Sequence, residues 1–189
     1  MRRSFLSVAL FAVACTQRSS GHDRPSPTPG ADHDALVLEA SVPDTGPSRE
    51  ALPVYPSDEL TTRARHLLEA IAKDDPTLAT DIVFPRDAYI EAKDAPDPGK
   101  QWDEKVMGAF QKQVHLLHKR TQGVEHAQFT GFELGQPIGQ VVPKKHDMAM
   151  TLWHVRHSRL EFTVEGKALR FDLGELMSWK GAWYVLDLR

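Results

Sequence analysis

The spacing of the apolar residues changes at Gly123, and this change constrains the fold more than any other feature of the chain. Before Gly123, apolar side chains recur every three or four residues, which is the period of an amphipathic helix. After it, apolar and polar side chains alternate, as they do in half-buried strands. The sequence therefore predicts an α+β fold, in which two to three N-terminal helices pack on a curved antiparallel sheet.

Three segments before Gly123 carry helix signals. The first begins at the N-cap residue Ser57 and ends at Asp75, because the following proline disfavours a helical conformation at that position. Asp75 can cap a short second helix, which ends before the next proline at residue 85. A third helix is predicted to start near Trp102, after a loop at residues 93–101, and to end at Gly123.

Five segments after Gly123 are predicted to be strands because they are rich in β-branched and aromatic residues. Glycine-containing turns, "EGK" and "WKGAW", separate the later ones and predict hairpins. Gly174 lies inside one of these segments and predicts a bulge that bends the strand. The strand segments read "AQFTGFEL", "MAMTLWHVRH", "LEFTVEG", "ALRFDLGELMSW" and "AWYVLDL".

The first fifteen residues have the three parts of a secretory signal: two arginines, an apolar run and small residues before a cleavage site. The apolar run is too short to span a bilayer, which needs about 20 residues. Ala14 followed by Cys15, the only cysteine of the chain, resembles the lipobox of bacterial lipoproteins, although Ala12 stands where that motif usually has leucine. The resemblance implies that the Cys15 thiol receives a diacylglycerol and that the peptide is then cut on the N-terminal side of Cys15. An ordinary signal peptide cut near Ala14 is the alternative.

The composition divides the chain into three regions. Residues 1–14 are predicted to be the signal peptide, and residues 15–56 a disordered tether that begins at the lipidated cysteine. Seven of the thirteen prolines lie in that tether, and it has too few apolar side chains to form a core. Its segment 34–42, "DALVLEASV", is either a chance apolar cluster or a short strand that docks. Residues 57–189 are predicted to form the globular domain.

The element order and the last hairpin resemble the cystatin-like and nuclear-transport-factor-two-like folds. The hairpin carries Trp179, Gly181, Trp183, Tyr184 and Val185 in the arrangement that many members of the second group share. The group includes ketosteroid isomerase and SnoaL-like cyclases as well as domains without catalysis, so the resemblance implies a fold and not a reaction. It also implies a cone-shaped pocket between the sheet and the helices.

Alternation places Met150, Leu152 and His154 on one face of a strand, together with Met148. If that face points inward, His154 enters the pocket, where its imidazole can act as a general base or contact a ligand. A histidine that only fills the core or its rim is the alternative. Tyr89 and Trp102 can line the mouth of such a pocket or belong to the core.

The last strand places Trp183 and Tyr184 on opposite faces. Tyr184 is predicted to be the buried ring because Leu186 and Leu188 share its face, while Asp187 shares the face of Trp183. Trp183 is then an exposed contact residue. The predicted ligand-binding residues are therefore His154, Met150, Leu152 and Trp183.

The charge composition and the absence of certain motifs disfavour several functions. Lys and Arg number 23 against 26 Asp and Glu, which does not predict a nucleic-acid partner. His115 and His118 lie three apart on a helix, but no third metal ligand accompanies them, so no metal site is predicted. The sequence has no glycine-rich phosphate loop and no serine in a nucleophile elbow, so no cofactor or catalytic residue is predicted. The sequence predicts a lipoprotein of the cell envelope that faces the periplasm or exterior. Its domain binds or scaffolds, with the membrane and an envelope protein as possible partners. The alternative is a small-molecule binder or enzyme that uses His154.

Overall fold

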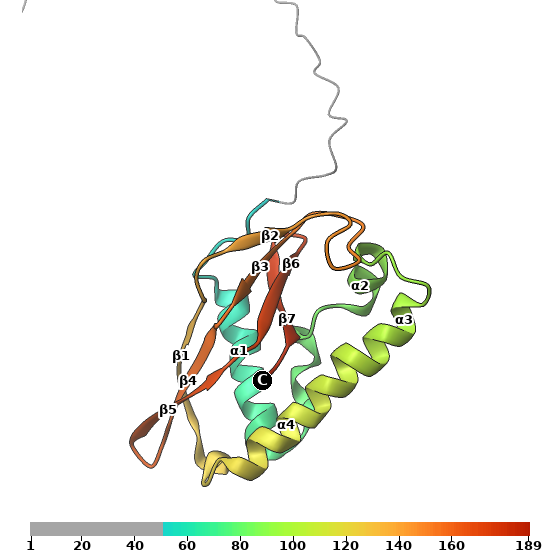
Figure 1. Ribbon diagram of the computed structural model, residues 1–189. Coiled ribbons are helices and arrows are strands. Elements are labelled where there is room, and N and C mark those ends of the chain that lie inside the picture. Colours follow the sequence, from blue (N-terminus) through green and yellow to red (C-terminus); the bar gives the residue numbers. More distant parts are fainter. Residues whose placement is uncertain (1–50) are drawn as a thin grey trace, which may run out of the picture. The chain divides into compact units, whose positions relative to one another are not determined.

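The computed structural model describes residues 51–189, so the predicted signal peptide, Cys15 and most of the predicted tether lie outside the described residues. Within that range the helical elements precede seven strands, and both sheets are antiparallel (Figure 1). The predicted α+β fold, with helices first and a sheet after them, is confirmed.

The first helix, α1 (Asp58–Lys73), begins where the sequence predicts. The Ser57 hydroxyl accepts a hydrogen bond from the backbone N–H of Leu60 at 3.2 Å, which satisfies one of the free N–H groups of the first turn. Asp74 ends the helix in the left-handed conformation. The face that α1 buries in the core consists of Leu60, Ala64, Leu67, Leu68, Ala70 and Ile71.

A 3-10 helix, η1 (Pro76–Ile82), follows at once. The Asp75 carboxylate caps it by accepting from the backbone N–H of Thr77 at 3.0 Å, as the sequence predicts. The next helix, α2 (Arg86–Ala92), was not predicted from the sequence, since a seven-residue helix is too short to show a clear apolar period.

The third helical run starts four residues earlier than predicted. It comprises α3 (Pro98–Gln101), the π-helical turn η2 (Trp102–Met107) and α4 (Gly108–Arg120), followed by the short η3 (Val124–His126). The early start is due to Asp97, whose carboxylate accepts from the backbone N–H of Lys100 at 2.9 Å. The side chains that this run buries recur every three or four residues: Val106, Phe110, Val114 and Leu117. No helix between residues 51 and 189 is long and apolar enough to cross a membrane.

The strands form two antiparallel sheets. The order in the smaller sheet is β1-β4-β5, and the order in the larger one is β2-β3-β6-β7. The strands are β1 (Gln128–Glu133), β2 (Gly139–Val141), β3 (Leu152–Arg156), β4 (Arg159–Val164), β5 (Lys167–Asp172), β6 (Glu175–Trp179) and β7 (Ala182–Asp187).

The two sheets share one long hairpin that kinks in both arms. One arm is β3 and β4, which are separated by His157 in the left-handed conformation and by the buried Ser158. The other arm is β5 and β6, separated by Leu173 and Gly174. The backbone N–H of Leu173 donates to the Ser158 carbonyl at 2.8 Å, so the arms stay paired through the kink. A Cβ at Gly174 would collide with Asp187, and the β6–β7 register shifts just after it, which confirms the predicted bulge.

The register of the larger sheet shows which side chains share a face. His154, Met177 and Tyr184 lie in one row across β3, β6 and β7, and Val155, Leu176 and Val185 lie in the next. Side chains in adjacent rows point to opposite faces. On the face of Val155, which Trp183 shares, the side chains of Leu176 and Val185 are also buried, whereas Trp153 is half-buried. The face of His154 is only partly covered.

This arrangement inverts the predicted facing of the last strand. Trp183 is 1% exposed and belongs to the core, whereas Tyr184 is half-buried. The hydroxyl of Tyr184 accepts from the Arg63 guanidinium at 3.3 Å, and the guanidinium carbon lies 4.4 Å from the centre of its ring. The prediction was wrong because Leu186 lies on the partly covered face, next to a cavity. The apolar side chain of Leu186 therefore did not indicate which face of the strand is buried in the core.

The inverted facing predicts the order of two mutant stabilities. Trp183→Ala should lower the free energy of unfolding by about 3–5 kcal/mol, because it removes a large, fully packed side chain. Tyr184→Ala should cost clearly less, since its ring is partly solvated and its main polar contact is to Arg63. Chemical denaturation of both variants measures the difference. Equal costs, or a larger cost for Tyr184→Ala, would contradict this facing.

Candidate functional site

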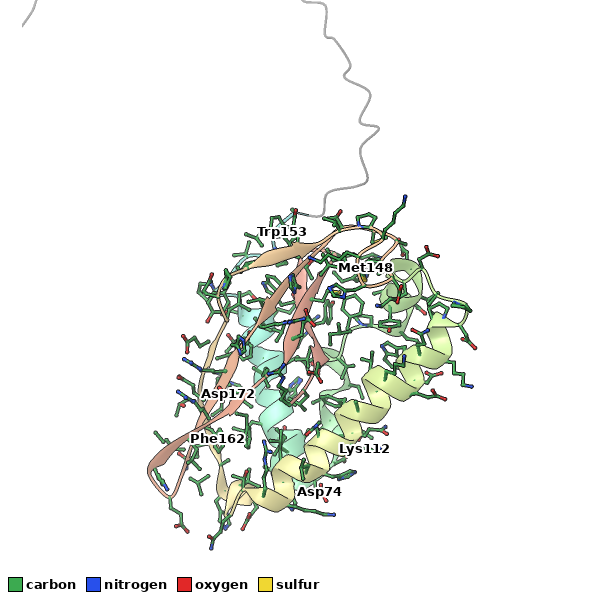
Figure 2. The ribbon with its side chains drawn as sticks, viewed as in Figure 1. Asp74, Lys112, Met148, Trp153, Phe162 and Asp172 are labelled. Atoms are coloured by element: carbon green, nitrogen blue, oxygen red, sulfur yellow. The ribbon has the colours of Figure 1, made fainter. Side chains whose placement is uncertain are left out.

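A cavity of about 180 Å³ lies between α2 and the partly covered face of the larger sheet. Figure 2 labels one of its lining residues, Met148, at the end of the sheet near α2. Most of the wall is apolar, and the polar side chains come from β3, β6, the end of α2 and the loop before β3. The lining residues are Phe84, Tyr89, Ala92, Lys93, Val141, His146, Met148, His154, Arg156, Glu175, Met177 and Leu186.

The loop between β2 and β3 closes one side of the cavity because it is hydrogen-bonded to the end of α2. The backbone N–H of Asp94 donates to the Asp147 carbonyl, and that of Ala149 donates to the Ala92 carbonyl, both at 2.8 Å. The Lys93 ammonium donates to the His146 carbonyl at 2.7 Å. His146 and Asp147 both adopt left-handed backbone conformations, which cost of order 1 kcal/mol each for non-glycine residues. These contacts hold the loop in place against that cost.

His154 is fixed at the cavity by Glu175. The Nδ1 atom of His154 lies 2.7 Å from Oε1 of Glu175, and the two side chains are 26% and 18% exposed. A carboxylate only accepts, so Nδ1 carries the proton in this pair. The other ring nitrogen, Nε2, lies beside Gly139 on the neighbouring strand, where a Cβ would come within 3.0 Å of it. Within residues 51–189 Nε2 has no hydrogen-bond partner, so it is free for a ligand or for proton transfer.

Glu175 also pairs with a permanently charged side chain. Its carboxylate lies 3.4 Å from the guanidinium of Arg156, which is about half exposed. The cavity lining therefore contains two permanent cations, Lys93 and Arg156, against the single carboxylate of Glu175. When His146 and His154 are neutral, the lining carries an excess of one positive charge.

Burial perturbs two groups of the cavity wall. It lowers the pKa of the Lys93 ammonium, because the charged form loses solvation, while the carboxylates of Asp147 and Glu175 oppose this shift. Burial also raises the pKa of the Tyr89 hydroxyl, and the nearby charge of Asp147 adds to the effect. In both groups, burial therefore disfavours the charged form.

Among the predicted ligand residues, His154 is the one that lines this cavity. Leu152 is buried and Met150 is partly buried, but neither contributes to the lining. Trp183 lies in the core on the opposite face of the sheet. Cys15 lies outside the described residues.

Sequence reasoning did not single out Glu175, Arg156 or Lys93. Glu175 directly follows the bulge at Gly174, and only the β3–β6 register brings it near His154 and opposite Arg156. Lys93 was assigned to a loop, where charged side chains are usually solvated. Tyr89, named as a possible mouth residue, does line the cavity.

The two helix histidines bind neighbouring parts of the chain. His115 pairs with the Asp74 carboxylate, and Nδ1 of His118 lies 2.9 Å from the Ile71 carbonyl. Both contacts attach α4 to the end of α1. Residues 51–189 contain no group of three or more histidine, cysteine or acidic side chains placed to hold a metal ion.

A larger depression of about 740 Å³ lies between the end of α4 and the β4–β5 hairpin. It is open to solvent, and charged side chains, including Arg120, Glu165 and Lys167, surround a floor made by Phe162 and Phe171. A small molecule there would keep most of its contact with water. The smaller cavity at His154 is the better candidate because it combines an apolar wall with convergent polar groups.

Comparisons of the chain with protein families, curated proteins and solved structures gave no match. The resemblance to the nuclear-transport-factor-two-like group thus stays a prediction.

The lowered pKa of Lys93 predicts how stability depends on pH. Lys93 titrates below its ordinary value of 10.5 in the folded chain, so between those two values the unfolded chain binds more protons. The free energy of unfolding therefore rises with pH across that interval. Lys93→Met removes this contribution, and its free energy of unfolding should rise less steeply with pH than that of the wild type.

Chemical denaturation between about pH 8 and pH 11 tests this expectation. The raised pKa of Tyr89 acts in the opposite direction at high pH, but both proteins contain Tyr89, so the difference between them isolates Lys93. Lys112→Met, at an exposed position on α4, is the matched control. Parallel pH profiles of the wild type and Lys93→Met would refute the assignment.

Proposed function

We propose that this domain binds a small molecule in the cavity beside His154 and does so without catalysing a reaction. The observation that carries the proposal is the His154–Glu175 pair in the lining of a cavity whose wall is mostly apolar. A histidine that only filled the core would lie against apolar or backbone groups on every side. Here a carboxylate orients the ring, and Nε2 is left for an external partner.

The size of the cavity limits the ligand. Cavities of about 150 Å³ lined by apolar side chains can hold a benzene molecule. The cavity of about 180 Å³ therefore suits a single ring or a short branched chain that carries one polar group. Larger ligands would need the loop at residues 142–151 to move away from α2.

Two methionines provide a direct test, since Met148 and Met177 line the cavity whereas Met107 and Met150 do not. In the full chain labelled with 13C-methyl methionine, the neutral probe benzyl alcohol or its anionic counterpart benzoate should shift the Met148 and Met177 signals and leave those of Met1, Met107 and Met150 in place. Ala92→Leu fills part of the cavity and should weaken this binding about tenfold or more.

The control for that substitution is Ala168→Leu, at an exposed position on β5, which should bind as the wild type does. If neither probe shifts Met148 and Met177 in the wild type, the binding proposal fails. Undiminished binding by Ala92→Leu would also count against this cavity.

We further propose that a lipid on Cys15 attaches the chain to a membrane of the cell envelope. The support comes from the sequence, where the single cysteine follows a short apolar run and an alanine. Two or three acyl chains give stable attachment where a single chain would not. The proline-rich residues up to 56 would then hold the binding domain away from the membrane surface.

Metabolic labelling tests the anchor. A palmitate analogue should mark the wild-type chain, and Cys15→Ser should lose the label and leave the membrane fraction. Ser19→Ala, four residues away and outside the expected motif, should label as the wild type does. Equal labelling of Cys15→Ser would end the lipoprotein interpretation without affecting the binding proposal.

A further inference from the structure

We infer that the ligand of the His154 cavity is a small monocarboxylate with an apolar body, held by the Lys93 ammonium. This inference rests on the proposed binding function and adds the chemical class of the ligand. It follows from the polar groups of the lining, the charge that they leave uncompensated and the shape of the apolar wall.

Lys93 is a partly buried cation without a carboxylate partner. No acidic side chain within residues 51–189 forms an ion pair with it. Its ammonium donates a hydrogen bond to the His146 carbonyl at 2.7 Å. An ammonium group has three N–H donors, so this contact leaves donors for a further acceptor. Arg156 differs, because Glu175 already compensates its charge. Lys93 is therefore the cation of the lining whose charge an anionic ligand would neutralise.

The charge balance favours a monoanion. The lining has one cation more than it has carboxylates, so a single negative charge neutralises it when the histidines are neutral. A dianion such as a phosphate monoester would leave one negative charge uncompensated in a partly apolar site. Asp147 acts on Lys93 from a distance, but it is exposed to water and does not line the cavity.

Further unpaired groups of the wall suit a carboxylate. The Tyr89 hydroxyl has no hydrogen-bond partner among residues 51–189, and burial keeps it in the neutral form that can donate. His154 can add a donor at Nε2 when it is protonated. The rest of the wall is apolar and offers Phe84, Met177 and Leu186 to the body of the ligand.

Benzoate and benzyl alcohol are the probes for this inference because they share a ring and differ in charge. Titrations of the full chain are followed through the methyl signals of Met148 and Met177. We expect benzoate to bind at least about tenfold more tightly than benzyl alcohol, which corresponds to about 1.4 kcal/mol. Lys93→Met should remove most of this advantage and leave the affinity for benzyl alcohol nearly unchanged.

Two further variants complete the experiment. Lys93→Arg keeps the positive charge and should retain the preference for benzoate, and Lys112→Met should behave as the wild type does. Unchanged binding of benzyl alcohol by Lys93→Met verifies that the cavity is still folded. If that variant does not fold, loss of the preference in Lys93→Arg or in Lys112→Met overturns the inference.

The outcomes separate the ligand class from the binding function. If both probes bind equally well, or if Lys93→Met keeps the preference for benzoate, the carboxylate inference fails and the binding function stands. Tighter binding of phenyl phosphate than of benzoate would also overturn the monoanion assignment. If no probe shifts Met148 and Met177, the binding function fails and this inference fails with it.

Discussion

The kink of the long hairpin at Ser158 is the constraint on which the rest of the sheet depends. Ser158 is fully buried, and its carbonyl and hydroxyl both accept hydrogen bonds: the carbonyl from the backbone N–H of Leu173, and the hydroxyl from the backbone N–H of Gly135 at 3.1 Å. Without these bonds, the turn of the chain at His157 would leave buried backbone groups unpaired, which costs about 1–3 kcal/mol each. The kink divides one ladder of paired strands into two sheets. As a result, the last residue of β3 lies opposite the first residue of β6.

The candidate site lies beside this kink. Arg156 is the last residue of β3 and Glu175 is the first residue of β6, and the two are direct partners in the register. The side chain of His154 is two rows further from the kink and therefore on the same face, within reach of the Glu175 carboxylate. Strand ends have fewer side-chain neighbours than strand centres, so charged groups there keep some contact with water. This placement lets three ionisable side chains gather next to an apolar wall without full desolvation.

The opposite wall depends on a different set of contacts. The end of α2 and the loop before β3 are joined by three hydrogen bonds, and the loop has its backbone in left-handed conformations at Lys144, His146 and Asp147. Lys93 joins the helix to the loop. Its backbone N–H donates to the Tyr89 carbonyl at the end of α2, and its ammonium donates to the loop at His146. The proposed ligand would thus contact the sheet on one side and, on the other, the end of α2 and the loop that is hydrogen-bonded to it. A loop of this kind is suited to admit and retain a small molecule.

The sequence by itself determined the order of the elements, the start of α1 at Ser57, the cap at Asp75 and the bulge after Gly174, because each depends on residues near in the chain. It also determined which side chains within β3 and β7 share a face, although Met148 and Met150, grouped with His154 by alternation, precede β3. It did not determine which face is buried, so Trp183 and Tyr184 were assigned to the wrong sides. Burial depends on what packs against the sheet. Only the tertiary structure brought Lys93 and Glu175 to His154, since strand register and the docking of α2 join residues that are 21 to 82 positions apart.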